Sequence, residues 1–521
     1  MTTSTAEILP KQPHTSFAFR LASSVLSGLL TVACFPSINL SGLVWLACLP
    51  LILAVVDEKQ LGRAYLLGAL SGTIFLAGSV YWFVEVMETY GRLPGWLALV
   101  VMVLFLLLVS TFWGVFGVVE CWVARRSVPL ALIMAPFLWV TLELARTYVY
   151  FTGFPWNLLG YAVRPAGLEQ LASVTAVYGL SFLAIASSAL LAALFLMPRE
   201  RMMRLVAAAW FVALLVANTL LRPPALPVPR QRAILLQPNA PLEERQLAAW
   251  IPWKNPATLE NLVARTIAAR QQDAPDGQGP ALLVWAESSA PFYFNRDPIF
   301  RGAMENMARQ AHAYVITNTV TFSGPDENSP HNSVVVLDRA GREILQYDKI
   351  HLVPFGEYVP EWLLRFGVGK ITSEVGNFVP GTRYTVAQTQ QGAIGIFICY
   401  EAIFPQLVRR LVPKGRGVLV NVSDDAWYGR SAARFQHLEM AQFRAIESHR
   451  YLLRATNDGV TAVIDPYGRI TARAPAYTAA TLAGAFDYLG DETFYNRYGD
   501  VFAWLCVAAT AVCAALAARP S

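Results

Sequence analysis

Charged residues are scarce in this 521-residue sequence. Asp, Glu, Lys and Arg together make up 15% of it, whereas a soluble globular chain carries about a quarter. Hydrophobic residues make up 55%, and the mean hydropathy is +0.41. This shortage of charge argues against a disordered or ordinary cytosolic protein and indicates a membrane protein. The net charge of +5 is also too small to predict nucleic-acid binding.

Metal-binding patterns are missing as well. The chain has six histidines, and none of them stands in an HExxH or similar metal-ligand spacing. We therefore expect no metal site, and no segment of the sequence indicates a cofactor.

Long apolar runs crowd the first 222 residues and return near the C-terminal end. A membrane-spanning helix needs about 20 mostly apolar residues, and eight runs are candidates: residues 17–35, 40–56, 64–84, 93–122, 130–150, 168–197, 205–221 and 501–518. The first two runs are short and adjoin, so they form either two spans or one re-entrant hairpin. We expect two spans, because half-spans exposed to lipid leave backbone groups unpaired. A cleaved signal peptide is the alternative for the first run, but no clean small-residue cleavage site follows it.

The distribution of Lys and Arg in the short connecting segments predicts the orientation. With the N-terminus inside, the inner segments hold Lys11, Arg20, Lys59, Arg63, Arg125, Arg126, Arg199, Arg201, Arg204 and Arg519, and the outer segments hold only Arg92, Arg146 and Arg164. We therefore expect a cytoplasmic tail at residues 1–16, a seven-helix bundle at 17–222, an outer domain at 223–490, and a final helix with a short cytoplasmic tail at 491–521.

Residues 223–490 read as a water-facing α/β domain. Short β-branched runs are typical of buried strands, and they occur at residues 233–237, 281–285, 314–320, 333–337, 394–398, 417–422 and 459–464. Helix-like stretches lie between several of them, at residues 256–270, 298–311 and 434–450. Alternation of strands with helices predicts an α/β fold.

One cysteine stands apart from the other five. Cys399 is the only cysteine of the outer domain, so it has no disulfide partner there. Free cysteines are often simply buried small hydrophobic residues, and cysteine content alone leaves both interpretations open. The surrounding sequence favours a nucleophile, because an apolar strand ends at Cys399 and a helix start follows. At such a turn the thiol is held rigidly and backbone N–H groups lie close by.

A reactive thiol needs a base or a positive charge beside it. Glu287 follows an apolar strand, and Lys349 and Glu357 lie in an otherwise apolar segment at residues 347–360. Taken singly, each of these charges is more typical of a solvated loop. A Cys–His pair is also possible, but no sequence pattern marks the histidine.

Taken together, these segments resemble the nitrilase superfamily. Its Glu, Lys and Cys occur in this order, in the contexts W-x-E-S around Glu287, D-K-x-H-L-V-P-F-G-E around Lys349 and C-Y-E around Cys399. With seven apolar runs before them and one after, the whole chain from about residue 20 resembles the membrane-embedded branch of that superfamily, the apolipoprotein N-acyltransferase family. Other matching segments are 153–156, 160–161, 332–333, 421–429, 436–437, 444–447, 454–457 and 493–500.

The resemblance implies an αββα sandwich carried by an eight-helix bundle in the inner membrane of a diderm bacterium, with the sandwich in the periplasm. It also implies transfer of an acyl chain from phospholipid, through a Cys399 thioester, to a diacylated apolipoprotein. Glu287 is then the general base, and Lys349 and the backbone N–H of Tyr400 stabilise the oxyanion. Glu357 and Glu401 are supporting carboxylates. We expect a monomer that contacts the bilayer and no nucleic acid.

Further residues are expected to bind or admit substrate. Asn332 lies in a segment that matches the family. The family has an essential tryptophan after the first predicted strand of the outer domain, and we choose Trp250 for it. Phe355, Phe154 and Trp156 are candidate gate residues at the lipid side. Asp424 stands where the family usually has Asn. Glu143 and Arg146, three residues apart near a predicted helix end, are expected to form a structural ion pair. A membrane-tethered amidase that passes its thioester to water remains the alternative function.

Overall fold

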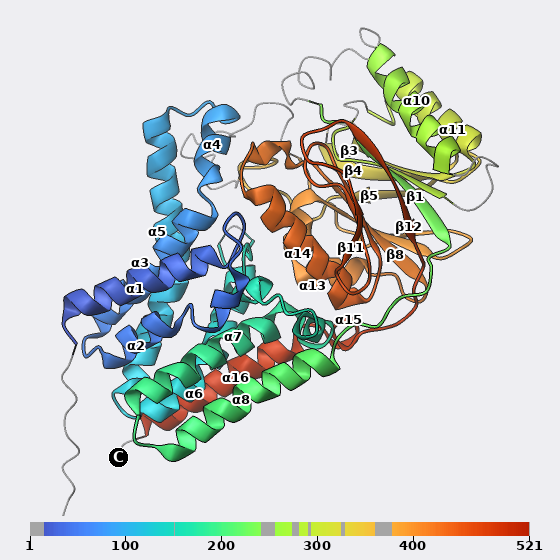
Figure 1. The fold of residues 1–521 in the computed structure, drawn as a ribbon. Helices are drawn as coiled ribbons and strands as arrows, with labels where there is room; N and C mark the ends of the chain where they lie inside the picture. The colour runs from blue at the N-terminus through green and yellow to red at the C-terminus, as the bar shows by residue number, and fades with distance from the viewer. Residues whose placement is uncertain are drawn as a thin grey trace, which may run out of the picture.

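The computed structural model describes residues 15–150, 152–240, 256–273, 281–289, 293–324, 329–359 and 378–519. Trp250 lies outside these ranges. The described chain forms two parts, a helical bundle built from both ends of the sequence and an α/β domain built from the segment between them (Figure 1).

The bundle contains eight helices on the predicted apolar runs or parts of them. Their bounds are α1 Phe17–Ala33, α2 Leu49–Asp57, α3 Leu61–Ser79, α5 Gly95–Ala124, α6 Val128–Tyr148, α7 Ala172–Leu196, α8 Arg201–Leu220 and α16 Val501–Ala518. Short turns of 3₁₀ helix, Ser41–Trp45 and Leu168–Leu171, precede α2 and α7. A short helix, α4 Trp82–Thr89, lies between α3 and α5.

Six of these helices are long and apolar enough to cross a membrane: α3, α5, α6, the segment Leu168–Leu196, α8 and α16. The first two predicted spans are shorter apolar helical segments, Phe17–Ala33 and Ser41–Asp57, and the second is broken before Leu49. Six candidate spans are therefore shown, and the full set of eight stays a prediction.

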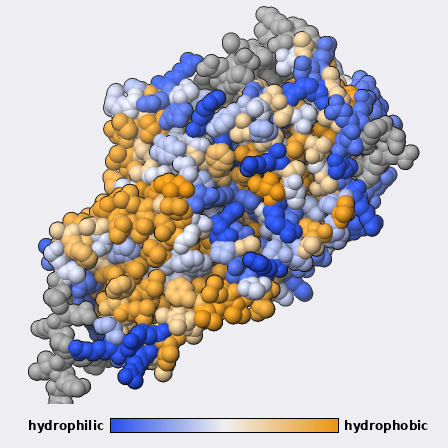
Figure 2. Space-filling view, viewed as in Figure 1, coloured by the Kyte–Doolittle hydropathy of each residue, from blue (hydrophilic) through white to orange (hydrophobic). Residues whose placement is uncertain are grey.

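The surface of the molecule changes character between its two parts. Hydrophobic residues cover the bundle and hydrophilic residues dominate the α/β domain (Figure 2). Large apolar side chains stand exposed on several bundle helices, among them Leu104, Leu107, Phe195, Leu215, Leu220, Trp504 and Leu505. Contiguous exposed apolar surface of this kind is typical of a membrane-facing region.

Two six-stranded sheets form the centre of the α/β domain. The first has the order β12-β1-β2-β3-β4-β5 and the second β11-β10-β9-β8-β7-β6. The strands of the first sheet are β1 Gln231–Gln237, β2 Ala281–Trp285, β3 Tyr314–Ser323, β4 Ser329–Leu337, β5 Glu343–Asp348 and β12 Ala480–Phe486. Those of the second are β6 Val386–Gln388, β7 Ala393–Ile398, β8 Gly417–Ser423, β9 Leu452–Thr456, β10 Ala462–Ile464 and β11 Ile470–Arg473.

Alternating side chains bind these sheets into layers. On β1, Ile234 and Leu236 pack in a cluster with helices α10 (Pro256–Asp273) and α11 (Pro298–Ala311), whereas Ala233 and Leu235 belong to the core between the sheets. Such alternation follows from the two-residue period of a strand. Helices α13 (Pro405–Leu411) and α14 (Ala433–Ser448) cover the second sheet on the side of the bundle (Figure 1). The order of layers is helix, sheet, sheet, helix, as predicted.

Strand β12 closes the first sheet against β1. The two strands are antiparallel, and their register runs from Gln231 opposite Phe486 to Gln237 opposite Ala480. Since β1 follows α8 and β12 precedes α16, the chain enters and leaves the domain on neighbouring strands.

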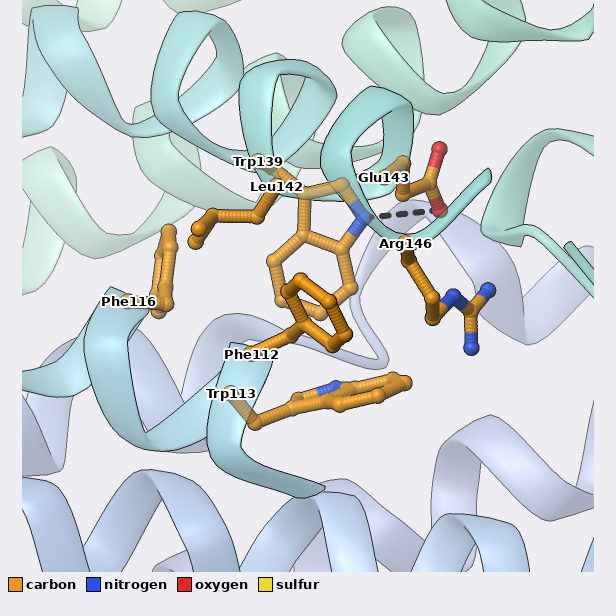
Figure 3. A pocket seen from close by; sticks show the side chains of 7 residues that line it. All are labelled: Phe112, Trp113, Phe116, Trp139, Leu142, Glu143 and Arg146. Carbon is orange, nitrogen blue, oxygen red and sulfur yellow. Dashed lines mark hydrogen bonds between the residues drawn. The ribbon is translucent and has the colours of Figure 1, made fainter. Parts of the chain in front are cut away.

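The segment after α6 is anchored by a buried carboxylate. Glu143 Oε1 accepts hydrogen bonds from Trp139 Nε1 at 3.0 Å and from the backbone N of Leu159 at 2.8 Å. The Arg146 guanidinium instead lies over the Trp113 ring, 5.0 Å from its centroid. Figure 3 shows these side chains at a pocket lined by Phe112, Trp113, Phe116, Trp139, Leu142, Glu143 and Arg146. The expectation of a Glu143–Arg146 ion pair is therefore wrong, because Glu143 instead binds the backbone of the loop that follows α6.

Aromatic residues join the bundle to the α/β domain. Trp82 of α4 packs edge-on against Tyr428, with ring centroids 4.8 Å apart, and Tyr90 donates a hydrogen bond to the carbonyl of Ala426 at 3.0 Å. These contacts place the turn before α14 directly on the bundle, and α14 itself packs against α7.

Candidate active site

Three predicted site residues each follow the end of a strand. Glu287 lies just after β2, Lys349 directly after β5 and Cys399 directly after β7. Their side chains are almost fully buried, with residue exposures of 6%, 1% and 6%. Two strands come from the first sheet and one from the second, so packing of the sheets brings together residues that are far apart in sequence.

Lys349 lies between two carboxylates. Its Nζ is 2.9 Å from Glu357 Oε1 and 3.7 Å from Glu287 Oε1. Asn332 Nδ2 donates to both of these oxygens, at 2.8 Å and 2.9 Å, and Asn332 Oδ1 accepts from Asn318 Nδ2 at 2.7 Å. Both ends of the Asn332 amide are therefore hydrogen-bonded within the protein, and its Nδ2 bridges the two carboxylates.

Glu287 and Glu357 are also held by backbone donors. The N–H of Asp424 donates to Glu287 Oε2 at 2.9 Å, and the N–H of Val353 donates to Glu357 Oε2 at 2.7 Å. Each carboxylate therefore has both oxygens in use, which fixes its orientation. The backbone contact at Asp424 does not depend on whether that residue is Asp or Asn.

The nucleophile candidate occupies an unusual backbone conformation. Cys399 has φ of 47°, a left-handed value that only a few per cent of non-glycine residues adopt. Strand β7 ends at Ile398 and a 3₁₀ turn, Cys399–Ile403, begins at the cysteine. A sharp turn of this kind presents a side chain at the end of a sheet.

Burial and charge determine the protonation of this cluster. Burial raises the pKa of the Cys399 thiol, and the Glu287 carboxylate raises it further, while Lys349 opposes both. Burial also raises the pKa of Glu287, again against Lys349. Burial alone lowers the pKa of Lys349, but Glu357 and Glu287 outweigh it and hold that pKa above its ordinary value. Burial therefore favours the neutral thiol at Cys399, and the two carboxylates favour the charged ammonium at Lys349.

Glu401 links the loop after β5 to the loop after β7. Its carboxylate accepts hydrogen bonds from the backbone N–H groups of Ile398 at 2.7 Å, Ile350 at 2.8 Å and His351 at 3.1 Å, and from the Tyr347 hydroxyl at 2.9 Å. It thus links the residues beside Cys399 to those beside Lys349. Its role as a supporting carboxylate of the site stays a prediction.

The titration of Glu401 gives a testable pH dependence. Burial raises its pKa to about 7 from an ordinary 4.5, although the backbone donors oppose this. The folded protein therefore binds a proton here between about pH 4.5 and 7 that the unfolded chain does not, so the stabilisation is complete below that window and is lost as the pH rises through 7. We expect the melting temperature of the native protein, relative to Glu401→Gln, to fall between pH 5 and pH 8. If the melting temperature of the native protein instead rises relative to that of Glu401→Gln as the pH increases, the raised pKa of Glu401 is contradicted.

The predicted gate residues differ in position. Phe355 is half-buried, has φ of 63°, and lies two residues before Glu357 on the loop that carries it. Phe154 and Trp156 are buried, with exposures of 8% and 1%, and stack on each other with centroids 6.4 Å apart. They pack between the bundle and the domain, so their role as gates stays a prediction. Tyr400 is buried beside Phe404.

Several neighbours of the site were not singled out from the sequence. Asn318 orients Asn332, and His437 contacts the carbonyl of Cys399 at 3.1 Å. Asp425 and Arg454 form a buried ion pair behind His437, with an O–N distance of 2.8 Å. The segments of the last three were noted only as matching a family, and only their positions in space show what they touch. Among the described residues, no cluster of His, Cys, Asp and Glu is arranged as a metal site.

Comparisons with known proteins agree over nearly the whole chain. Residues 27–190 match the family model described as the apolipoprotein N-acyltransferase N-terminal domain, and residues 235–489 match that of carbon-nitrogen hydrolase. The chain is 38% identical over 505 residues to the apolipoprotein N-acyltransferase of Geobacter metallireducens, covering 95% of each chain. It is 32% identical over 483 residues to that of Methylococcus capsulatus, covering 89% of this chain and 90% of the relative. An amidase structure from Nesterenkonia sp. aligns with 52% of this chain and 94% of its own, with 17% identity and a TM-score of 0.37.

Proposed function

Because this chain belongs to the apolipoprotein N-acyltransferase family, we propose that it acylates lipoproteins in two steps. An acyl chain, the sn-1 chain of a phospholipid, first passes to the thiol of Cys399. It then passes to the α-amino group of an N-terminal diacylglyceryl-cysteine. The observation that carries this proposal is the convergence of Glu287, Lys349 and Cys399 at three strand ends.

In the first step Glu287 takes the proton from the Cys399 thiol, and the thiolate attacks the ester carbonyl. The oxygen of the tetrahedral intermediate becomes negative, and the Lys349 ammonium and the Tyr400 N–H stabilise it. The carbon–oxygen bond then breaks, and the lysophospholipid leaves with the proton held by Glu287. The product is a thioester on Cys399.

In the second step the amine attacks the thioester carbonyl and loses a proton to Glu287. The carbon–sulfur bond breaks, the amide forms, and the thiolate recovers its proton. A thioester is activated enough for an amine to displace it, so no nucleotide is consumed. Use of one site for both steps predicts ping-pong kinetics.

The position of the site suits substrates that stay in a bilayer. The aromatic contacts between α4 and the turn before α14 join the site's domain to a bundle with six candidate spans. We propose that the bundle crosses the inner membrane of a diderm bacterium with eight helices, that the α/β domain is periplasmic, and that the protein acts as a monomer. This arrangement keeps the thiol near the headgroups of the outer leaflet.

The test of this function offers the purified protein a phospholipid and a diacylglyceryl-cysteine peptide in detergent. We expect triacylated peptide and an equal amount of lysophospholipid, measured by mass spectrometry. Free fatty acid formed at the same rate with or without peptide supports the amidase-like alternative, in which water takes the acyl group. Absence of both products contradicts an acyltransferase.

A further inference from the structure

The peptide group between Cys399 and Tyr400 has a side-chain partner from another element. His437 of α14 places Nε2 3.1 Å from the carbonyl oxygen of Cys399. A carbonyl only accepts hydrogen bonds, so Nε2 carries the proton in this contact. The imidazole is fully buried, with 0% of its surface exposed.

The opposite nitrogen of this imidazole lies between a donor and an acceptor. Nδ1 lies 3.1 Å from Arg454 Nη2, which only donates, and 3.1 Å from Asp425 Oδ1. Asp425 is itself paired with Arg454 at 2.8 Å, so its charge is balanced without His437. Burial lowers the pKa of His437, and the Arg454 guanidinium lowers it further. Both effects favour the neutral ring, although Asp425 opposes them. In either protonation state Nε2–H donates to the Cys399 carbonyl.

The planarity of the peptide bond transmits this contact to the proposed oxyanion donor. In a trans peptide the C=O of Cys399 and the N–H of Tyr400 lie in one plane and point in opposite directions. A hydrogen bond that fixes the carbonyl therefore also fixes the direction of the N–H. It polarises the peptide group as well, which strengthens the N–H as a donor. The left-handed φ of Cys399 is unfavourable for a residue other than glycine, so contacts from the surrounding structure must hold it.

We propose that His437 is a positioning residue, whose Nε2–H holds the Cys399–Tyr400 peptide plane so that the Tyr400 N–H faces the oxyanion. This inference rests on the proposed function and assigns His437 a part in it. His437 acts through the backbone, because its contact is with the carbonyl of Cys399 and its remaining nitrogen is engaged with Arg454.

The membrane bundle holds this imidazole in place. The Trp156 ring stacks on it at 28° with centroids 5.8 Å apart, and Trp156 Nε1 donates to Gln436 Oε1 at 2.8 Å. Gln436 Nε2 in turn donates to the carbonyls of Pro36 at 3.0 Å and Ser79 at 3.1 Å. The geometry of the oxyanion donor is thereby tied to bundle loops rather than to the α/β domain alone.

Two rates measured on the same thiol separate this role from a merely structural one. Acylation of Cys399 by a p-nitrophenyl acyl ester passes through an oxyanion, whereas alkylation by iodoacetamide does not. His437→Asn keeps a polar group but is too short to reach the Cys399 carbonyl. We expect its acylation rate to fall about 100-fold, as for loss of an oxyanion donor, while alkylation changes less than about threefold. His437→Gln, which is longer and carries N–H donors, should recover at least about tenfold of the loss.

Controls keep the outcomes distinct. His449→Asn, at the left-handed residue that ends the same helix, should leave both rates as in the native protein. Equal slowing of acylation and alkylation in His437→Asn, or no change in either, overturns the role of His437. If His437→Asn does not fold, His437→Gln alone must still lower the ratio of the two rates at least about twofold, and an unchanged ratio is equally contrary. Failure of the native protein to acylate Cys399 at all contradicts the proposed function instead.

Discussion

Replacement of Cys399 by alanine should abolish acyl transfer, with a fall in kcat/KM of at least about 10⁴-fold, because loss of a catalytic nucleophile has effects of this size. The residual groups, including the Lys349 ammonium, can still bind substrate but have nothing to acylate. The measurement is formation of triacylated peptide, together with the intact mass of the protein after incubation with phospholipid. The native protein should gain one acyl chain, and Cys399→Ala should gain none.

A matched control removes a different buried cysteine. Cys513→Ala changes a thiol of α16, within the bundle, which is 9% exposed. This variant should retain both the acyl adduct and the activity. Full activity of Cys399→Ala, or an adduct that persists in it, would show that the acyl chain is carried elsewhere and would remove the basis of the proposed mechanism.

Replacement of Lys349 by methionine should have the second largest effect. The change removes the cation that lies 2.9 Å from Glu357 and 3.7 Å from Glu287 while it leaves both carboxylates buried. Two consequences follow: the oxyanion loses its charged donor, and the pKa of Glu287 rises further because Lys349 no longer opposes burial. We expect kcat to fall at least about 10³-fold and the melting temperature to decrease, since two buried carboxylates lose the cation between them.

Alkylation of the thiol gives a second measurement for this variant. Lys349 lowers the pKa of Cys399 against burial, so iodoacetamide at neutral pH should react more slowly with Lys349→Met than with the native protein. Lys414→Met, at an exposed residue of the loop after α13, is the matched control and should leave kcat unchanged. A variant at position 349 with normal kcat would exclude Lys349 from the site.

Several elements could be predicted from the sequence pattern. A short apolar run and a helix-like stretch predicted β2 and α11 at the bounds that the structure has, Ala281–Trp285 and Pro298–Ala311. Strands with polar or weakly apolar sequences escaped prediction, such as β5, Glu343–Asp348, and β12, Ala480–Phe486. Both are edge strands, whose one free side allows side chains that a central strand does not.

The site was predictable only in part, for a related reason. Glu287, Lys349 and Cys399 could be named because the segments around them, taken together, resemble the nitrilase superfamily. His437 was not named as a site residue, because it lies in a helix of mixed composition. Its contact with the Cys399 carbonyl, 38 residues away in the sequence, is visible only in the structure. The contact of Glu143 could not be predicted either. Its carboxylate accepts from the backbone N–H of Leu159, in the loop beyond its own helix, and does not pair with the arginine one turn along.

The pairing of β1 with β12 sets a condition on biosynthesis. A nascent chain synthesised only as far as β11 still lacks the strand that pairs with β1, so the first sheet retains an open hydrogen-bonding edge. The sheet is complete only after residue 486 has been made, shortly before helix α16. The strand that closes the first sheet is therefore synthesised after every other strand of both sheets.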